Sequence, residues 1–320
     1  MNKNIATITF NPAYDLVGYT NQIHCGEVNL LKTTGLYPAG KGINVAKILK
    51  YFSIDVTVSG FLGKENQDGF QKLFTKMNFS NRFILVEGRT RINVKVTEKN
   101  GSLTDLNFSG FSLTEQAWED FASDSLIWLK KFDILCISGS LPTGIRLSSF
   151  SQWMRELNRC CPFIIFDSSQ EALLAGLEAK PWLIKPNHRE LETLVGKKLS
   201  TIKDIVSCAR NIQKQGIHHV VVSLGPEGAV WVNPKEEWIA KPPYCNVVST
   251  VGAGDAMVGG MIYGLLMNYS SEYTLRLATA LSSLTVSQSS LEISDRKKLD
   301  AMMERIVLHP YQTMIAGETK

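Results

Sequence analysis

Two short apolar runs, Ile134-Leu135-Cys136-Ile137 and Phe163-Ile164-Ile165-Phe166, flank a stretch of helical periodicity at 147–159 and decide the fold class. The same rhythm continues on both sides, with helical patterns at 114–130, 171–177 and 201–215 and apolar strands at 182–184 and 219–222. Wholly apolar strands that alternate with helices are typical of a parallel sheet covered on both faces. We therefore predict an α/β fold with a mostly parallel central sheet.

The first third of the chain adds strands to this sheet and contains two insertions. Strands are expected at 5–9, 54–61 and 82–86, and helices after Gly42 and at 69–77. Short alternating runs within 16–35, such as Val28-Asn29-Leu30-Leu31, predict small antiparallel strands. A hairpin is predicted from 92–96 with 103–108. We interpret residues 1–320 as a single domain, with lid-like strands inserted at about 12–35 and 90–110.

The composition is that of a soluble globular protein, with 44% hydrophobic and 20% charged residues among 320. A net charge of +4 without a Lys/Arg run predicts no nucleic-acid and no membrane partner. A strand pattern that begins at Ile5 predicts no signal peptide. The six scattered cysteines are interpreted as free thiols, which favours a cytoplasmic location, and the five histidines lack zinc-site spacing.

Polar and glycine residues follow each predicted strand, where parallel sheets bind their ligands. These segments are 138–142 (Ser-Gly-Ser-Leu-Pro), 167–169 (Asp-Ser-Ser), 185–190 (Lys-Pro-Asn-His-Arg-Glu), 223–225 (Ser-Leu-Gly), and Asn11 with Asp15 after the first strand. They predict a polar active-site rim along one edge of the sheet.

The segment Gly252-Ala253-Gly254-Asp255 opens an amphipathic helix whose apolar positions include Val258, Met261 and Ile262. One interpretation is an ordinary first-turn Asp with Ser249 or Thr250 as the N-cap. The other is a general base beside backbone N–H groups that bind an anion, as phosphoryl transfer to a hydroxyl requires.

A second helix entry, Ala39-Gly40-Lys41-Gly42-Ile43-Asn44, is either a plain turn or a sugar site in which Asn44 meets hydroxyl groups and Lys41 meets a phosphate. It is no P-loop, because Gly42 stands where Ser or Thr would hold magnesium. No G-x-G-x-x-G opens a βα unit, which argues against a dinucleotide-dependent oxidoreductase. The pair Arg89 and Arg91 is either solvated or a cationic clamp for a phosphorylated substrate.

Asn187-x-x-Glu190 opens a further helix and has two interpretations. The pair matches a capping box, in which Asn and Glu satisfy the first backbone N–H groups. An amide oxygen and a carboxylate one turn apart could instead hold a hydrated Mg²⁺. Ser223-Leu224-Gly225 with Gly228 is a weak signal, because glycines between strands are common.

Taken together, these motifs resemble the ribokinase-like PfkB family of carbohydrate kinases over residues 3–308. Gly40–Ala46 and Gly252–Asp255 resemble its two signatures, and Asn187-x-x-Glu190 resembles its magnesium motif. The segments 11–15, 138–142 and 185–187 resemble its sugar-phosphate branch. The resemblance implies a three-layer α/β/α ribokinase-like fold with a small β-strand lid.

The resemblance also implies roles for individual residues. Asp255 would be the catalytic base, and Gly252, Ala253 and Gly254 would supply the anion hole. Asp15, Gly40 and Asn44 would bind the sugar, and its phosphate would meet Lys41, Arg89, Arg91 and Ser140. Mg²⁺ would be held by Asn187 and Glu190. The ATP site would comprise Lys185, Asn187, Gly254, Ser223, Leu224, Gly225, Pro226, Glu227 and Gly228.

The activity implied is ATP- and Mg²⁺-dependent phosphorylation of fructose 1-phosphate at O6. Fructose 6-phosphate and tagatose 6-phosphate are alternative acceptors, because the residue types cannot separate them. An alternative of another class is a non-catalytic sugar-phosphate-binding module that regulates a partner. The resemblance further implies a homodimer that forms through the lid.

Overall fold

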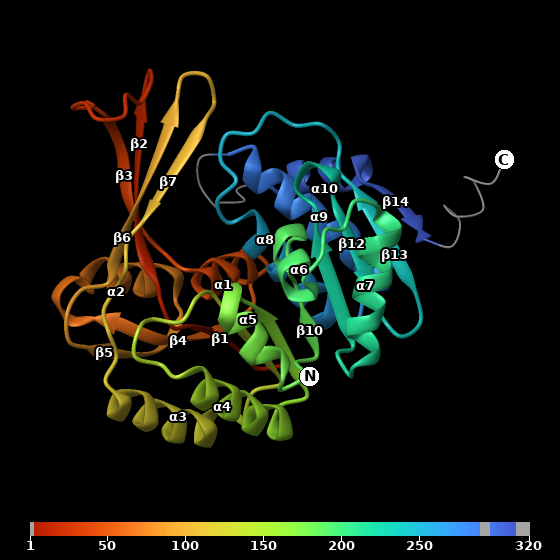
Figure 1. Cartoon of the computed structure of the whole chain (residues 1–320), viewed down its shortest axis with the longest axis horizontal. Coiled ribbons are helices and arrows are strands. Elements are labelled where there is room, and N and C mark those ends of the chain that lie inside the picture. Colours follow the sequence, from red (N-terminus) through yellow and green to blue (C-terminus); the bar gives the residue numbers. More distant parts are fainter. Residues whose placement is uncertain (1–2, 289–294, 312–320) are drawn as a thin grey trace.

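The computed structural model describes residues 3–288 and 295–311, which form a large and a small β-sheet (Figure 1). The large sheet has ten strands in the order β14-β13-β12-β11-β10-β9-β8-β1-β4-β5, and those from β11 to β5 pair in parallel. Its strands are β1 (Ile5–Thr9), β4 (Val56–Gly63), β5 (Ser80–Val86), β8 (Ile134–Ser138), β9 (Phe163–Asp167), β10 (Leu183–Ile184), β11 (His219–Ser223), β12 (Ala229–Val232), β13 (Glu237–Lys241) and β14 (Val307–Pro310). The predicted parallel core is confirmed.

Three strands at one edge, β12, β13 and β14, are antiparallel, which the helix–strand rhythm did not predict. The connection from β11 to β12 holds only a short turn at 224–228, including the 3-10 helix η2 (Gly225–Glu227). A parallel crossover needs a dozen or more residues, so this connection can only make a hairpin.

Helices cover both faces of the large sheet, because alternate residues of its buried strands enter two separate cores. Leu135 and Ile137 of β8 pack in one core, and Ile134 and Cys136 pack in the other. The first core is covered by α3 (Glu115–Leu129), α4 (Leu147–Cys160), α5 (Gln170–Leu177), α6 (His188–Val195) and α7 (Ile202–Lys214). The second is covered by α1 (Lys41–Tyr51), α2 (Asp68–Met77), α8 (Ala253–Leu266), α9 (Ser271–Val286) and α10 (Arg296–Arg305). This is the expected three-layer α/β/α fold.

The small sheet, called the lid sheet below, stands away from the large sheet in Figure 1 and has the strand order β3-β2-β6-β7. Its strands are β2 (Ala13–Thr20), β3 (Lys32–Ala39), β6 (Arg91–Glu98) and β7 (Leu103–Asn107). The β6–β7 hairpin confirms the predicted turn, while β2 and β6 pair in parallel.

The strand predicted at Val28–Leu31 is wrong. These residues lie in the connection between β2 and β3, beyond the last pair of Tyr19 with Lys32. The side chains of Val28 and Leu30 are 92% and 88% exposed, so no packing rewards the alternating pattern there. No helix among the described residues is long and apolar enough to cross a membrane.

Candidate active site

The carboxyl ends of β1, β8, β9, β10 and β11 bring the predicted polar segments together. The Asn11 side chain donates to Ser140 Oγ at 3.2 Å, which joins the segments after β1 and β8. The Gly139 N–H donates to the Asp167 carbonyl at 3.0 Å, and the Ser223 N–H donates to the Pro186 carbonyl at 3.1 Å. Lys185 Nζ lies 3.5 Å from Asp167 Oδ1, which joins the segments after β9 and β10. Residues at the ends of five different strands therefore form one continuous rim, as expected.

Helix α8 begins at this rim without a cap from any side chain within residues 3–288 and 295–311. Its N-cap residue is Gly252, which has a left-handed φ of 77° and makes no capping hydrogen bond through a side chain. The predicted cap by Ser249 or Thr250 is wrong, because both precede Gly252 and Ser249 Oγ instead accepts from the Val251 N–H at 3.2 Å. The first turn of α8 is therefore suited to bind an external anion.

Asp255 lies in this first turn, is 6% exposed, and accepts a hydrogen bond from Asn44 Nδ2 at 2.8 Å. Burial is the main reason that its pKa rises to about 6, and the negative charge of Asp167 raises it further. The rise is opposed by the charges of Lys41 and Lys185 and by the Asn44 hydrogen bond. Asn44 belongs to α1, which also begins without a side-chain cap, at Gly40. Two uncapped helix starts thus meet at a carboxylate whose pKa suits a general base near neutral pH.

Asp167 is the functional residue to which sequence analysis assigned no role. It is 1% exposed, and its Oδ1 lies 3.3 Å from Lys41 Nζ and 3.5 Å from Lys185 Nζ. Burial alone would raise the pKa of Asp167, but the charges of Lys185 and Lys41 outweigh it and lower that pKa. The available signal was its place directly after a buried strand, at the same edge as the other rim residues.

The two lysines extend this charge cluster to both helix starts. Lys185 is 4% exposed, and a Cβ on Gly254 would lie 3.3 Å from its Nζ, so the ammonium group borders the first turn of α8. Burial alone would lower the pKa of Lys41, but Asp167, Asp255 and Glu190 outweigh it and raise that pKa. Positive charge is therefore held beside both the predicted sugar side and the predicted ATP side.

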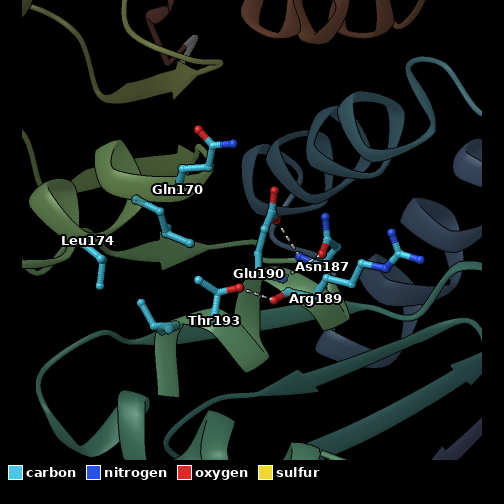
Figure 2. A pocket seen from close by; sticks show the side chains of 8 residues that line it. Gln170, Leu174, Asn187, Arg189, Glu190 and Thr193 are labelled. Carbon is cyan, nitrogen blue, oxygen red and sulfur yellow. Dashed lines mark hydrogen bonds between the residues drawn. The ribbon is translucent and has the colours of Figure 1, made fainter. Parts of the chain in front are cut away.

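Asn187 and Glu190 form a complete capping box at the start of α6 (Figure 2). The Glu190 N–H donates to Asn187 Oδ1 at 2.9 Å, and the Asn187 N–H donates to Glu190 Oε2 at 2.8 Å. Both residues also line a pocket of about 140 Å³ with Gln170 and Arg189. The capping interpretation is confirmed, and the magnesium interpretation stays a prediction.

The predicted ATP loop lies next to this helix start. Ser223 forms an isolated parallel bridge with Asn187. The Leu224 N–H donates to the Gly228 carbonyl at 2.8 Å, so 224–228 closes on itself. The left-handed φ values of Gly225 (61°) and Gly228 (99°) explain why glycine occupies both positions. Gly225, Pro226 and Glu227 are exposed and available to a ligand.

The lid sheet supplies the remaining predicted sugar-binding residues. Asp15 is 8% exposed and accepts from Asn93 Nδ2 at 3.3 Å. The Arg91 guanidinium donates to the carbonyl groups of Asn11 at 3.1 Å and Pro12 at 3.4 Å, and burial lowers its pKa.

Arg89 is more exposed than Arg91, and its Nε lies 3.8 Å from Glu65 Oε2. Both arginines line a pocket of about 680 Å³ together with Phe108 and Gly110. The pocket is compatible with the predicted phosphate clamp.

Comparison with known proteins places these features in context. A model of pfkB family carbohydrate kinases matches residues 3–298. The chain is 63% identical to 1-phosphofructokinase of Escherichia coli strain K12, over 97% of this chain and 100% of that protein. It is 47% identical to 1-phosphofructokinase of Haemophilus influenzae, over 98% of this chain and 99% of that protein.

Solved structures have the same fold. Phosphofructokinase-2 of Escherichia coli in complex with fructose-6-phosphate has a TM-score of 0.84 at 29% identity, with 94% of this chain and 98% of that chain covered. A possible 1-phosphofructokinase of Thermotoga maritima has a TM-score of 0.86 at 23% identity, with 96% of this chain and 99% of that chain covered. This similarity is one of fold.

Proposed function

Because the chain belongs to the pfkB family of carbohydrate kinases, we propose that it transfers the γ-phosphoryl group of ATP to O6 of fructose 1-phosphate. The products are fructose 1,6-bisphosphate and ADP. The observation that carries this proposal is the buried Asp255 in the first turn of an uncapped helix. The acceptor is inferred from the 63% identity to 1-phosphofructokinase of Escherichia coli.

Asp255 acts as the general base in this proposal. Its carboxylate takes the proton of the O6 hydroxyl while the O6–P bond forms and the bond from the γ-phosphorus to the bridging oxygen of ADP breaks. Asn44 holds one carboxylate oxygen at 2.8 Å and so limits its rotation. A pKa of about 6 leaves the carboxylate mostly ionised at pH 7 and able to accept the proton.

The negative charge of the transferred group is met by fixed donors. The backbone N–H groups of Gly252, Ala253 and Gly254 would bind its oxygens, because no side chain caps α8 among the described residues. Lys185 borders Gly254 from the ATP side, and Lys41 stands on the sugar side. Asp167 keeps both ammonium groups in place.

The side chains on the ATP side offer carboxylate and amide oxygens, which are the ligands that Mg²⁺ prefers. Asp167 Oδ2 is buried and has no hydrogen-bond partner within 3–288 and 295–311, so a carboxylate oxygen is left for a cation. Asn187 and Glu190 would hold the ion together with Asp167, directly or through water. When bound there, Mg²⁺ would supply positive charge that offsets the charge of the phosphate groups during transfer.

The remaining predicted residues complete two binding regions. Asp15, Gly40 and Asn44 would bind the sugar, and Arg91, Arg89 and Ser140 would meet its 1-phosphate. Residues 223–228 would line the ATP site. We expect the chain to work as one kinase domain in the cytoplasm.

A coupled assay of ADP release tests the proposal. It compares fructose 1-phosphate, fructose 6-phosphate, tagatose 6-phosphate and fructose in the presence of ATP and Mg²⁺. We expect a kcat/KM for fructose 1-phosphate at least ~100-fold above the others, about 2.7 kcal/mol of transition-state preference. Preference for a 6-phosphate contradicts the substrate alone, and binding without turnover supports the regulatory-module alternative.

We also propose that a second copy of the chain packs on the face of the lid sheet opposite to Asp15, which carries Leu16 because strand side chains alternate. An apolar row crosses all four strands of the lid sheet. In this row each residue is the cross-strand neighbour of the next, in the order Leu36, Leu16, Val94 and Leu106. Leu36 and Leu106 are 50% and 51% exposed. An apolar row of this width is typical of a surface that another chain covers.

Sedimentation velocity tests this contact. Leu106→Asp is expected to convert a homodimer to a monomer, because it places a charge in the apolar row. Ile127→Asp is the matched control, since Ile127 is a 62% exposed apolar residue on α3. Phosphofructokinase-2 of Escherichia coli has a tetrameric inhibited form, so the same experiment also distinguishes a tetramer from a dimer. Equal behaviour of the two variants contradicts the lid contact.

A further inference from the structure

The face of the lid sheet that carries Asp15 also carries a lysine to which the mechanism gives no role. Asp15 of β2 pairs with Asn93 of β6, and Lys95 follows two residues later on the same face, because strand side chains alternate. Lys95 in turn pairs with Asp105 across β6 and β7. Side-chain exposures of 12% for Asp15 and 11% for Lys95 show that this cation is largely withdrawn from water.

Lys95 stands between two carboxylates. Its Nζ donates to Asp105 Oδ1 at 3.2 Å and lies 3.9 Å from Asp15 Oδ1. The longer distance is an ionic contact without a hydrogen bond, so Asp105 holds the ammonium group more closely. Asn93 is the hydrogen-bond donor to Asp15, and its own Oδ1 is buried without a partner among the described residues.

The charges around Asp15 act in opposite directions. Burial is the main reason that its pKa is raised, and the charge of Lys95 is the first to oppose it, followed by the Asn93 hydrogen bond. Asp105 raises that pKa further, whereas Lys47 of α1 lowers it. Arg91 is a further cation on β6 that interacts with Asp15. Lys95 is therefore the charge that most strongly opposes the rise in the pKa of Asp15.

We propose that Lys95 is a positioning residue for sugar recognition, which holds Asp15 ionised and in place while Asp105 competes for the same ammonium group. The inference rests on the proposed function, in which Asp15 binds the sugar. An ionised carboxylate accepts hydrogen bonds from two hydroxyl groups, whereas a protonated one must also donate. Sugar affinity then depends on the charge that Lys95 supplies, and phosphoryl transfer at Asp255 does not.

The test compares Lys95→Met with Asp105→Asn between pH 5.5 and 8, using KM and kcat for fructose 1-phosphate at saturating MgATP. We expect Lys95→Met to raise KM about 10- to 30-fold and to change kcat less than about 3-fold. The ratio of its KM to that of the wild type should grow as pH falls, because Asp15 protonates at a higher pH without Lys95. Because the variant and the wild type are assayed with the same substrate, the titration of the substrate phosphate cancels in this ratio of KM values.

Asp105→Asn should act in the opposite direction. It frees the ammonium group for Asp15, so its KM should stay within about 3-fold of the wild type and its ratio should fall as pH falls. Lys95→Arg keeps the charge and should give a ratio that does not vary with pH. If Lys95→Met does not fold, the Asp105→Asn and Lys95→Arg profiles still decide the matter.

A merely structural pair gives a different pattern. If Lys95→Met and Asp105→Asn raise KM alike, with ratios independent of pH and equal losses in Tm, the pair only joins β6 to β7 and the proposal is overturned. A wild-type chain that turns over another sugar phosphate contradicts the proposed acceptor alone, and the ratios are then measured with that sugar phosphate. A wild-type chain that binds no sugar phosphate contradicts both the proposed function and the proposed role of Lys95.

Discussion

Helices α6, α7 and α8 each carry an acidic residue at their third position, yet the three carboxylates have different partners. Glu190 of α6 and Asp204 of α7 turn back to the N–H of their own N-cap residues and complete capping boxes. Asp255 of α8 is held by Asn44 from another helix, and no side chain in the described part of the chain caps α8. The N-cap residue makes the difference, because Asn187 and Thr201 offer a side-chain oxygen and Gly252 offers none.

The comparison teaches how one local pattern serves two purposes. A capped helix start uses up its backbone donors within the chain and gains stability, typically about 1 kcal/mol. An uncapped start keeps those donors for an external anion. The proposed catalytic base is thus an acidic residue at the third helical position that takes no part in capping and is buried beside backbone N–H groups that no side chain of the described residues caps.

The difference between the helix starts is tested most directly by neutralising the acidic residue at the third position of two helices. Asp255→Asn is expected to lower kcat by ~10²–10⁴-fold, because an amide cannot take the proton of the hydroxyl. Asp204→Asn in α7 should leave kcat within about 2-fold and only weaken its cap. Steady-state kinetics measure both, and near-normal turnover by Asp255→Asn refutes its role as base.

The glycine at the start of α8 can be tested against a glycine of similar conformation elsewhere. Gly252→Ala is expected to lower kcat about 10- to 100-fold, because a Cβ at a φ of 77° strains the turn and displaces the donors. Gly196→Ala, at a φ of 67° after α6, carries similar strain with no atom within 4 Å of the new Cβ. Equal losses of activity in the two variants contradict a specific role for Gly252.

The pH dependence separates the activity of Asp255 from its effect on stability. Its pKa of about 6 in the free chain lies above the ordinary 3.8, so kcat/KM, which reports the free enzyme, should fall about tenfold per pH unit below 6 as the base is protonated. The folded chain binds this proton more tightly than the unfolded chain does. The free energy of unfolding should therefore decline as pH rises from about 4 to about 6.

Asp255→Asn removes this destabilising charge. It should raise the free energy of unfolding at pH 7.5 by about 1–3 kcal/mol, since one pKa unit corresponds to about 1.4 kcal/mol. Urea denaturation at pH 5 and pH 7.5 measures the effect. A variant that is less stable than the wild type at pH 7.5 contradicts it.

The smallest expected effect distinguishes the two roles of Asn187. Asn187→Ala and Thr201→Ala each remove one capping box and should each cost about 1 kcal/mol of stability, or a Tm lower by about 2–4 °C. If Asn187 also helps to hold Mg²⁺, its variant alone should need several-fold more Mg²⁺ for half-maximal activity. Equal Mg²⁺ requirements reduce Asn187 to a helix cap.

Much of the fold and of the candidate site could be predicted from the sequence, because the signals were local. The parallel strands were recognisable as apolar runs, and Asn44 and Asp255 occupied motifs whose small neighbours pointed to close approach. The role predicted for Lys185 came from the family resemblance alone. The strand predicted at Val28–Leu31 failed for the complementary reason. An alternating pattern makes a strand only where a neighbouring strand is within reach, and the sequence does not report that distance.

The sequence by itself determined the parallel core of the sheet and the alternation of its helices and strands, and it offered the capping box at Asn187 as one of two interpretations, since each depends on residues a few positions apart. Only the tertiary structure decided that Asn44 meets Asp255 across 211 positions and that Lys41 meets Asp167 across 126. It likewise placed one lysine between Asp15 and Asp105. These contacts follow from which strands and helices pack side by side, and a charge acts through space on whatever that packing brings near.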